Sequence, residues 1–170
     1  MNQELLDKLK VISPEEEQIL AGETEVQKSI YTAADDFIVD GSQMLDAGKL
    51  IDIRPHTRFV HFPRHKHNYI EIIYMCSGTT THIINDTTKV TLDTGDLLFL
   101  NQNATQEILP AGEEDIAVNF IVLPEFFDRT FLMIDERSAL QEFLVGALKK
   151  NRMRFIPTTS VPLWMEKSQS

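Results

Sequence analysis

The sequence predicts a mainly β protein, an antiparallel sandwich or barrel with short helices before and after it. Between residues 27 and 123, short runs rich in Val, Ile, Thr, Phe and Tyr follow one another closely. Turn residues separate these runs, among them Gly78, the pair Asn85–Asp86 and Gly95. Short strands at such spacing are typical of two-sheet antiparallel folds. The segments on either side of this region instead carry apolar side chains at helical spacing.

The composition is that of a globular protein with an excess of acidic groups. The chain has 170 residues, enough for one domain, with 42% hydrophobic and 25% charged residues and a formal net charge of −10. Nucleic acids and anionic membranes are both bound through Lys and Arg, so we expect this chain alone to bind neither. A single cysteine, a polar amino terminus without a signal peptide and no apolar run of membrane-spanning length predict a cytoplasmic protein.

The first 26 residues are predicted to form a helical arm. Leu5, Leu6 and Leu9 have the spacing of a first helix. Ser13 can cap a second helix that begins at Pro14, and Glu16 completes a capping box.

Four histidines gather at the start of the β region, within twelve residues. Side chains alternate along a strand, so His65, His67 and Glu71 would share one face if a single strand ran through all three. Two imidazoles and a carboxylate could then bind Zn, Fe, Mn or Ni. In the alternative interpretation, the three groups only satisfy one another inside the barrel. For His56 and His61 we expect hydrogen-bonded or solvent-exposed positions.

The next strands are predicted from their turns. The apolar run Ile72–Ser77 ends at Gly78, and a further apolar run, Leu97–Leu100, follows Gly95. His82 belongs to the hairpin partner of the histidine-bearing segment and could reach a pocket inside the barrel.

From Pro124 onward, the apolar spacing again predicts amphipathic helices. Pairing the second of these helices with its copy would bury its apolar stripe, so we expect a homodimer. The expected interface residues are Leu140, Phe143, Leu144, Ala147 and Leu148.

The spacing of these motifs resembles that of the cupin superfamily. His65-x-His67-x3-Glu71-x6-Gly78 is similar to the first cupin motif, and Gly95 followed by Asp96 and an apolar strand is similar to the start of the second. The resemblance implies a cupin-like antiparallel double-stranded β-helix, or jelly-roll barrel, with short N-terminal helices and C-terminal amphipathic helices.

Three positions depart from the cupin pattern. Phe59 stands where the first motif has a glycine, Asn101-Gln102-Asn103 replaces a Pro-x-Gly turn, and Gln106 replaces a metal-binding histidine. An amide is a poorer ligand than imidazole for these metals, so we expect either no cofactor or a weakly held Zn, Fe, Mn or Ni ion. The metal set that the resemblance implies is His65, His67, Glu71 and Gln106.

Within the cupins, the chain most resembles the N-terminal sensing domains of bacterial AraC-type transcription regulators. The segments that carry the resemblance are Arg58–Phe59, Phe62–His67, Glu71–Tyr74, Gly95–Leu98 and Asn119–Pro124. It implies an arm over residues 1–26, an effector-binding cupin barrel over 27–123, and dimerising helices with a tail over 124–170. In that family a separate C-terminal helix-turn-helix part reads DNA, and we expect it to be absent from this chain.

The leading hypothesis is therefore an effector-binding and dimerisation domain that senses a small molecule, specifically a carbohydrate, and is not an enzyme. Its expected ligand-binding residues are His65, His67, Tyr69, Glu71 and Gln106. The alternative is a metal-dependent cupin enzyme of the dioxygenase or sugar isomerase type that uses His65, His67 and Glu71.

Overall fold

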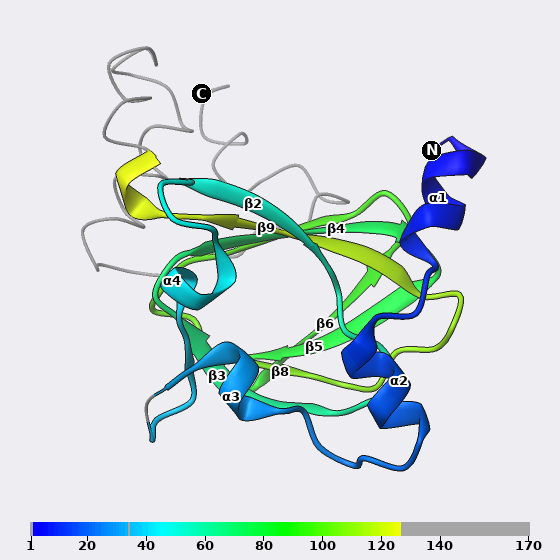
Figure 1. Ribbon diagram of the computed structural model, residues 1–170, viewed down its shortest axis with the longest axis horizontal. Coiled ribbons are helices and arrows are strands. Elements are labelled where there is room, and N and C mark those ends of the chain that lie inside the picture. The colour runs from blue at the N-terminus through cyan, green and yellow to red at the C-terminus, as the bar shows by residue number, and fades with distance from the viewer. Residues whose placement is uncertain (1, 34, 127–170) are drawn as a thin grey trace, which may run out of the picture.

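A computed structural model describes residues 2–33 and 35–126 of the chain (Figure 1). The elements in chain order are α1 (Gln3–Leu9), α2 (Pro14–Leu20), α3 (Lys28–Tyr31), β1 (Ile38–Val39), α4 (Gly41–Met44), β2 (Ile51–Pro55), β3 (Phe62–His67), β4 (Ile70–Ser77), β5 (Thr79–Ile84), β6 (Thr88–Asp93), β7 (Leu97–Leu100), β8 (Gln106–Ile108) and β9 (Ile116–Val122).

Two sheets face each other across the interior. One has the strand order β1-β3-β8-β5-β6 and the other β2-β9-β4-β7. The strand pairs are antiparallel, apart from β1 with β3. In Figure 1, β2, β9 and β4 lie above β3, β8, β5 and β6, and α2 and α3 lie at the lower front. The prediction of a mainly β, two-sheet fold with short N-terminal helices is confirmed.

The predicted capping box opens α2. The Ser13 amide donates to Glu16 Oε2 at 2.9 Å, and the Glu16 amide donates to Ser13 Oγ at 3.2 Å. Helix α1 places Leu6 and Leu9 against the outer face of the four-stranded sheet, on a cluster that includes Cys76. A local capping signal thus fixes the start of α2, and contacts with the sheet hold α1.

The predicted turns adopt left-handed backbone conformations. Gly78, between β4 and β5, has φ +70°, and Asn85 and Asp86 have φ 53° and 66° between β5 and β6. Two such central residues match the twist of the strands in a two-residue hairpin. Phe59, at the position where cupins have a glycine, has φ 69°. Phe59 therefore adopts a left-handed conformation that glycine accepts more readily.

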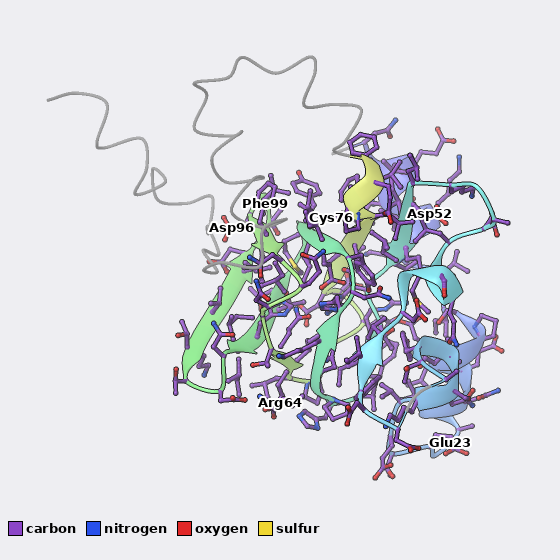
Figure 2. The ribbon with its side chains drawn as sticks, turned by 90° about the vertical axis from the view of Figure 1, so that its left-hand side faces the viewer. Glu23, Asp52, Arg64, Cys76, Asp96 and Phe99 are labelled. Carbon is purple, nitrogen blue, oxygen red and sulfur yellow. The ribbon has the colours of Figure 1, made fainter. Side chains whose placement is uncertain are left out.

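The apolar core fills one part of the space between the sheets. Ile73, Met75, Leu92, Leu98 and Leu100 are at most 1% exposed and form one cluster. Figure 2 shows side chains packed between the sheets, with Glu23 and Arg64 at the outer edge. The rest of the interior contains a cavity, which is lined in part by residues of β2, β3 and the start of β4.

The expected interface residues Leu140, Phe143, Leu144, Ala147 and Leu148 lie outside the described residues. In the described part of the chain, no helix has both the length and the apolar character that crossing a membrane requires.

Candidate functional site

A cavity of about 360 Å³ lies inside the barrel. Four of the five predicted ligand-binding residues line it, namely His65, His67, Tyr69 and Glu71. These four residues are only 2–3% exposed. The fifth, Gln106, is fully buried outside the cavity wall, where its Nε2 lies 3.0 Å from His82 Nδ1.

The single unbroken strand assumed for His65, His67 and Glu71 is not formed, and that expectation was wrong. Strand β3 ends at His67, and β4 begins at Ile70 in the opposite sheet. The chain crosses between the sheets at residues 68 and 69, and the burial alternates only as far as Tyr69, since Tyr69, Ile70 and Glu71 are all buried. The imidazoles and the carboxyl group therefore converge from two sheets rather than from one strand.

A chain of polar contacts crosses the cavity. His56 Nδ1 lies 3.1 Å from Asn119 Oδ1, and Asn119 Nδ2 donates to Glu71 Oε1 at 3.1 Å. Glu71 Oε2 is 3.4 Å from His67 Nε2. The His67 ring packs edge-on against His65, with centroids 4.8 Å apart. These contacts connect the end of β2 with β9, β4 and β3.

Burial keeps these groups uncharged. It lowers the pKa of His56 and His67 and brings the pKa of His65 down to about 4. Burial also raises the pKa of Glu71 to about 8, and the hydrogen bond from Asn119 only partly opposes this rise. At neutral pH the wall therefore carries neutral imidazoles and a Glu71 carboxyl group that is largely protonated.

These shifts predict how stability depends on pH. Between about pH 4 and 6.5 the unfolded histidines bind protons that the folded ones do not, so the free energy of unfolding falls on acidification. Glu71 acts in the opposite sense. Its contribution is fully present below pH 4.5 and is lost as the pH rises toward 8, because only the unfolded carboxyl group ionises in that range.

Urea unfolding of wild type and Glu71→Gln between pH 6.5 and 8.5 measures the second effect. We expect the wild type to lose stability across this range and Glu71→Gln to lose clearly less. The exposed Glu23→Gln should retain the wild-type slope. Equal slopes for wild type and Glu71→Gln would contradict the raised pKa of Glu71.

The metal set implied by the resemblance stays a prediction. His65 Nδ1 contacts the Pro63 carbonyl oxygen at 2.7 Å, which leaves Nε2 for a ligand, and Gln106 Nε2 is directed toward His82. Among residues 2–33 and 35–126, no three His, Cys, Asp or Glu side chains are placed to share a metal ion. A Zn, Fe, Mn or Ni site at His65, His67, Glu71 and Gln106 is therefore still a prediction from the sequence.

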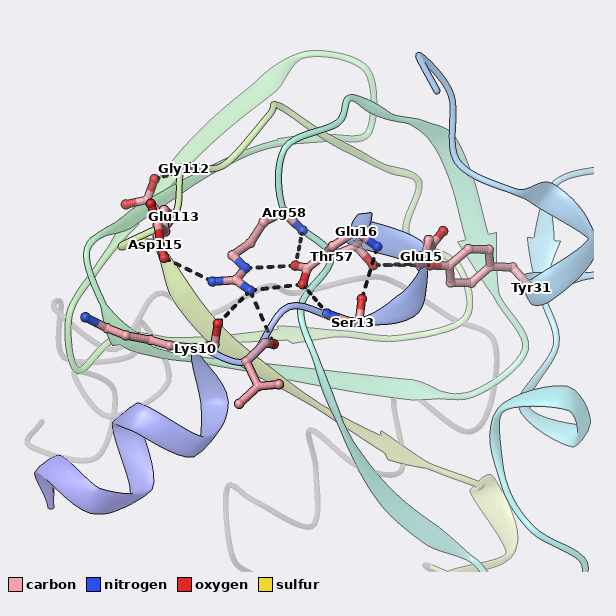
Figure 3. A network of polar contacts seen from close by, with 11 residues as sticks. Lys10, Ser13, Glu15, Glu16, Tyr31, Thr57, Arg58, Gly112, Glu113 and Asp115 are labelled. Atoms are coloured by element: carbon pink, nitrogen blue, oxygen red, sulfur yellow. Dashed lines mark hydrogen bonds and ion pairs between the residues drawn. The ribbon is translucent and has the colours of Figure 1, made fainter. Parts of the chain in front are cut away.

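The N-terminal arm and helix α3 form part of the cavity wall. Residues 13–16 and 30–31 line the cavity. The Tyr31 hydroxyl donates to Glu15 Oε2 at 2.5 Å and lies 3.1 Å from Thr57 Oγ1. A buried ion pair fastens this arm to the barrel, because Arg58 Nε donates to Glu16 Oε1 at 2.8 Å and Arg58 Nη2 to Glu16 Oε2 at 2.9 Å (Figure 3).

Sequence reasoning missed several residues of the wall. His56, expected only to be hydrogen-bonded or exposed, is buried and lines the cavity, whereas His61 is exposed and lies 2.8 Å from Glu107. Asn119 was not considered for the pocket, although a single amide within the apolar run Ile116–Val122 is a recognisable signal. Nothing local marks Glu15 or Tyr31, because the arm reaches the barrel only through the tertiary fold.

Residues 51–133 match the family model for the AraC-like ligand binding domain. An apo ToxT variant from Vibrio cholerae is similar to this chain, with a TM-score of 0.41 and 12% identity, covering 52% of this chain and 35% of that one. A cupin protein from Bacteroides fragilis gives a TM-score of 0.35 and 24% identity, covering 43% and 63%. A search of curated proteins finds no significant match.

Proposed function

Because this chain contains an AraC-like ligand binding domain of cupin fold, we propose that it is the effector-sensing part of an AraC-type transcription regulator. The observation that carries this proposal is the cavity inside the matched barrel, with polar side chains of both sheets in its wall. A cavity of about 360 Å³ has the size that small-molecule sites show. We propose that the effector contacts His65, His67, Tyr69 and Glu71 and that Gln106 supports this layer from behind.

A carbohydrate is the class of effector that we propose. Sugar hydroxyls both donate and accept hydrogen bonds, and the carboxyl, imidazole and amide groups of Glu71, His56 and Asn119 can match them. The Tyr69 ring, packed 4.9 Å from the His67 ring, offers an apolar face to a sugar ring.

The proposal also covers the domain's mode of action, its location and the roles of its three segments. The domain acts by binding rather than by catalysis, in the cytoplasm, without contacting a membrane or nucleic acid itself. Residues 1–26, 27–123 and 124–170 act as arm, barrel and dimerising helices, with Leu140, Phe143, Leu144, Ala147 and Leu148 between two copies. DNA is bound by a helix-turn-helix part outside this chain.

A thermal-shift screen of neutral sugars and sugar phosphates, followed by calorimetry on any hit, tests effector binding. A ligand that binds only the folded state raises the melting temperature. We expect His67→Leu to weaken the hit about tenfold, because a buried hydrogen-bonding partner is lost. His61→Leu is the matched control, since it makes the same change at an exposed histidine just before β3, outside the cavity.

Two outcomes would oppose this proposal. Equal affinities in His67→Leu and His61→Leu would place the ligand outside the cavity. A screen without any hit from sugars, sugar phosphates or other small molecules would argue against effector sensing itself.

A further inference from the structure

The cavity wall has hydrogen-bonding capacity that the described residues leave unused. Four of its residues carry a buried polar atom without a hydrogen-bond partner among the described residues, namely Glu15 Oε1, His56 Nε2, His67 Nδ1 and Glu71 Oε2. Glu71 Oε2 has only its 3.4 Å contact with His67 Nε2. Buried polar atoms are normally paired, so several such atoms around one cavity indicate a ligand that supplies their partners.

Two of these four atoms can only accept, and the other two can accept or donate. Asn119 Nδ2 donates to Glu71, so the Asn119 Oδ1 that faces His56 Nδ1 is an acceptor. His56 therefore carries its proton on Nδ1, and its Nε2 is a lone pair. Glu15 Oε1 is a carboxylate oxygen and also accepts. Glu71 Oε2 accepts when its carboxyl group is ionised and donates when it is protonated, and His67 Nδ1 acts in either sense according to its tautomer.

Arg58 and Tyr31 have partners for their donor groups, whereas Arg54 keeps part of its donor capacity. Arg58 is occupied by Glu16 and by the carbonyl oxygens of Glu113 and Lys10. The Tyr31 hydroxyl donates to Glu15. Arg54 lines the cavity, and its Nε donates to the Met44 carbonyl oxygen at 3.0 Å. Its terminal nitrogens can therefore donate to acceptors of the ligand.

We propose that the effector carries a protonated primary amino group that is bound against Glu71, with His56 as a second acceptor. An ammonium group has three donors and no lone pair, whereas each hydroxyl brings lone pairs that need donors in turn. The body of the ligand packs against the apolar part of the wall, which Val39, Phe62 and Ile108 contribute.

This inference rests on the proposed function and narrows its ligand class, since an amino sugar would satisfy both. A cation beside Glu71 also favours the ionised carboxylate, which is the form that accepts hydrogen bonds at both oxygens.

Three matched probes test the inference by calorimetry on the full chain at neutral pH. Cyclohexylamine, cyclohexanol and cyclohexanecarboxylate share one ring and differ in the group that would meet Glu71. We expect the amine to bind about tenfold or more tighter than the alcohol, because hydrogen bonds to charged groups are the stronger ones. The carboxylate should bind weakest.

Two variants locate the amino group. Glu71→Gln should remove the preference for the amine while retaining the affinity for cyclohexanol, which shows that the cavity is intact. His56→Leu should reduce the preference less. The exposed Glu23→Gln, at the outer edge in Figure 2, should behave as wild type.

The outcomes separate the inference from the function beneath it. Equal binding of amine and alcohol by the wild type, or tightest binding of the carboxylate, would overturn the inference and leave effector sensing in place. A preference for the amine that persists in Glu71→Gln would overturn the assignment to Glu71. If none of the three probes and no sugar binds, the proposed function fails together with the inference.

Discussion

Replacing Arg58 with methionine is expected to lower the free energy of unfolding by about 3–5 kcal/mol. The Arg58 and Glu16 side chains are only 2% and 4% exposed, so the substitution would leave the Glu16 carboxylate buried without its counter-charge. The same guanidinium also donates to the Glu113 and Lys10 carbonyl oxygens at 3.0 and 3.2 Å. Arg58 lies in the segment between β2 and β3. It therefore connects this segment with the arm and with the loop before β9.

Urea unfolding of Arg58→Met, Glu16→Gln and the double variant measures this effect. The double variant should be destabilised by less than the sum of the single changes, because neither charge is then left alone. Lys10→Ala is the control. It removes an ion pair with the largely exposed Glu114 and should have a far smaller effect. Additive single effects, or an Arg58→Met effect as small as that of Lys10→Ala, would contradict the role assigned to the buried pair.

Gly78→Ala is the second change with a large expected effect, a loss of roughly 2–5 kcal/mol of unfolding free energy. A left-handed backbone costs an alanine about 1–2 kcal/mol, and Gly78 has φ +70°. An added Cβ would also lie 2.8 Å from the Glu114 carbonyl oxygen and 2.9 Å from Asp115 Cα, closer than real Cβ contacts allow. Overpacking of this kind adds about 1–3 kcal/mol.

The Cβ of an alanine at position 78 would also collide with Asp115 Oδ1, and this carboxylate cannot easily move away. Its Oδ1 accepts from the Thr79 amide at 2.8 Å, and its Oδ2 accepts from the Gly112 amide at 2.7 Å. Gly95→Ala is the matched control, because Gly95 has φ +98° but no atom within 4 Å of an added Cβ. It should cost only the conformational part, about 1–2 kcal/mol. Equal losses at the two glycines would show that steric contact at Gly78 contributes nothing.

Features of this fold that depend on residues close together in the sequence could be predicted from the sequence. The capping box at Ser13, the turn at Asn85–Asp86 and the glycine at Gly78 each follow from local backbone requirements. The two-sheet fold follows from the spacing of such signals. Phe59 marks the limit of this reasoning, because its left-handed backbone is kept by the surrounding structure and not by its own preference.

The candidate site could be predicted only in part, for the same reason. The alternation from His65 to Glu71 found four wall residues, although it assumed one strand where the chain crosses between sheets. The partner of His56 lies 63 residues away at Asn119, and the partner of Arg58 lies 42 residues away at Glu16. Contacts at such separations depend on how strands and helices assemble, which no local pattern records.

The ion pair between Arg58 and Glu16 also bears on where the folding unit begins. The family match starts at residue 51, after the arm and β1. A fragment cut at that point would lack residues 13–16 and 30–31, and its cavity would lose that part of its wall. It would also retain Arg58 without the carboxylate that neutralises it. We therefore expect the cooperative unit to extend upstream of the boundary drawn by sequence similarity and to include helix α2.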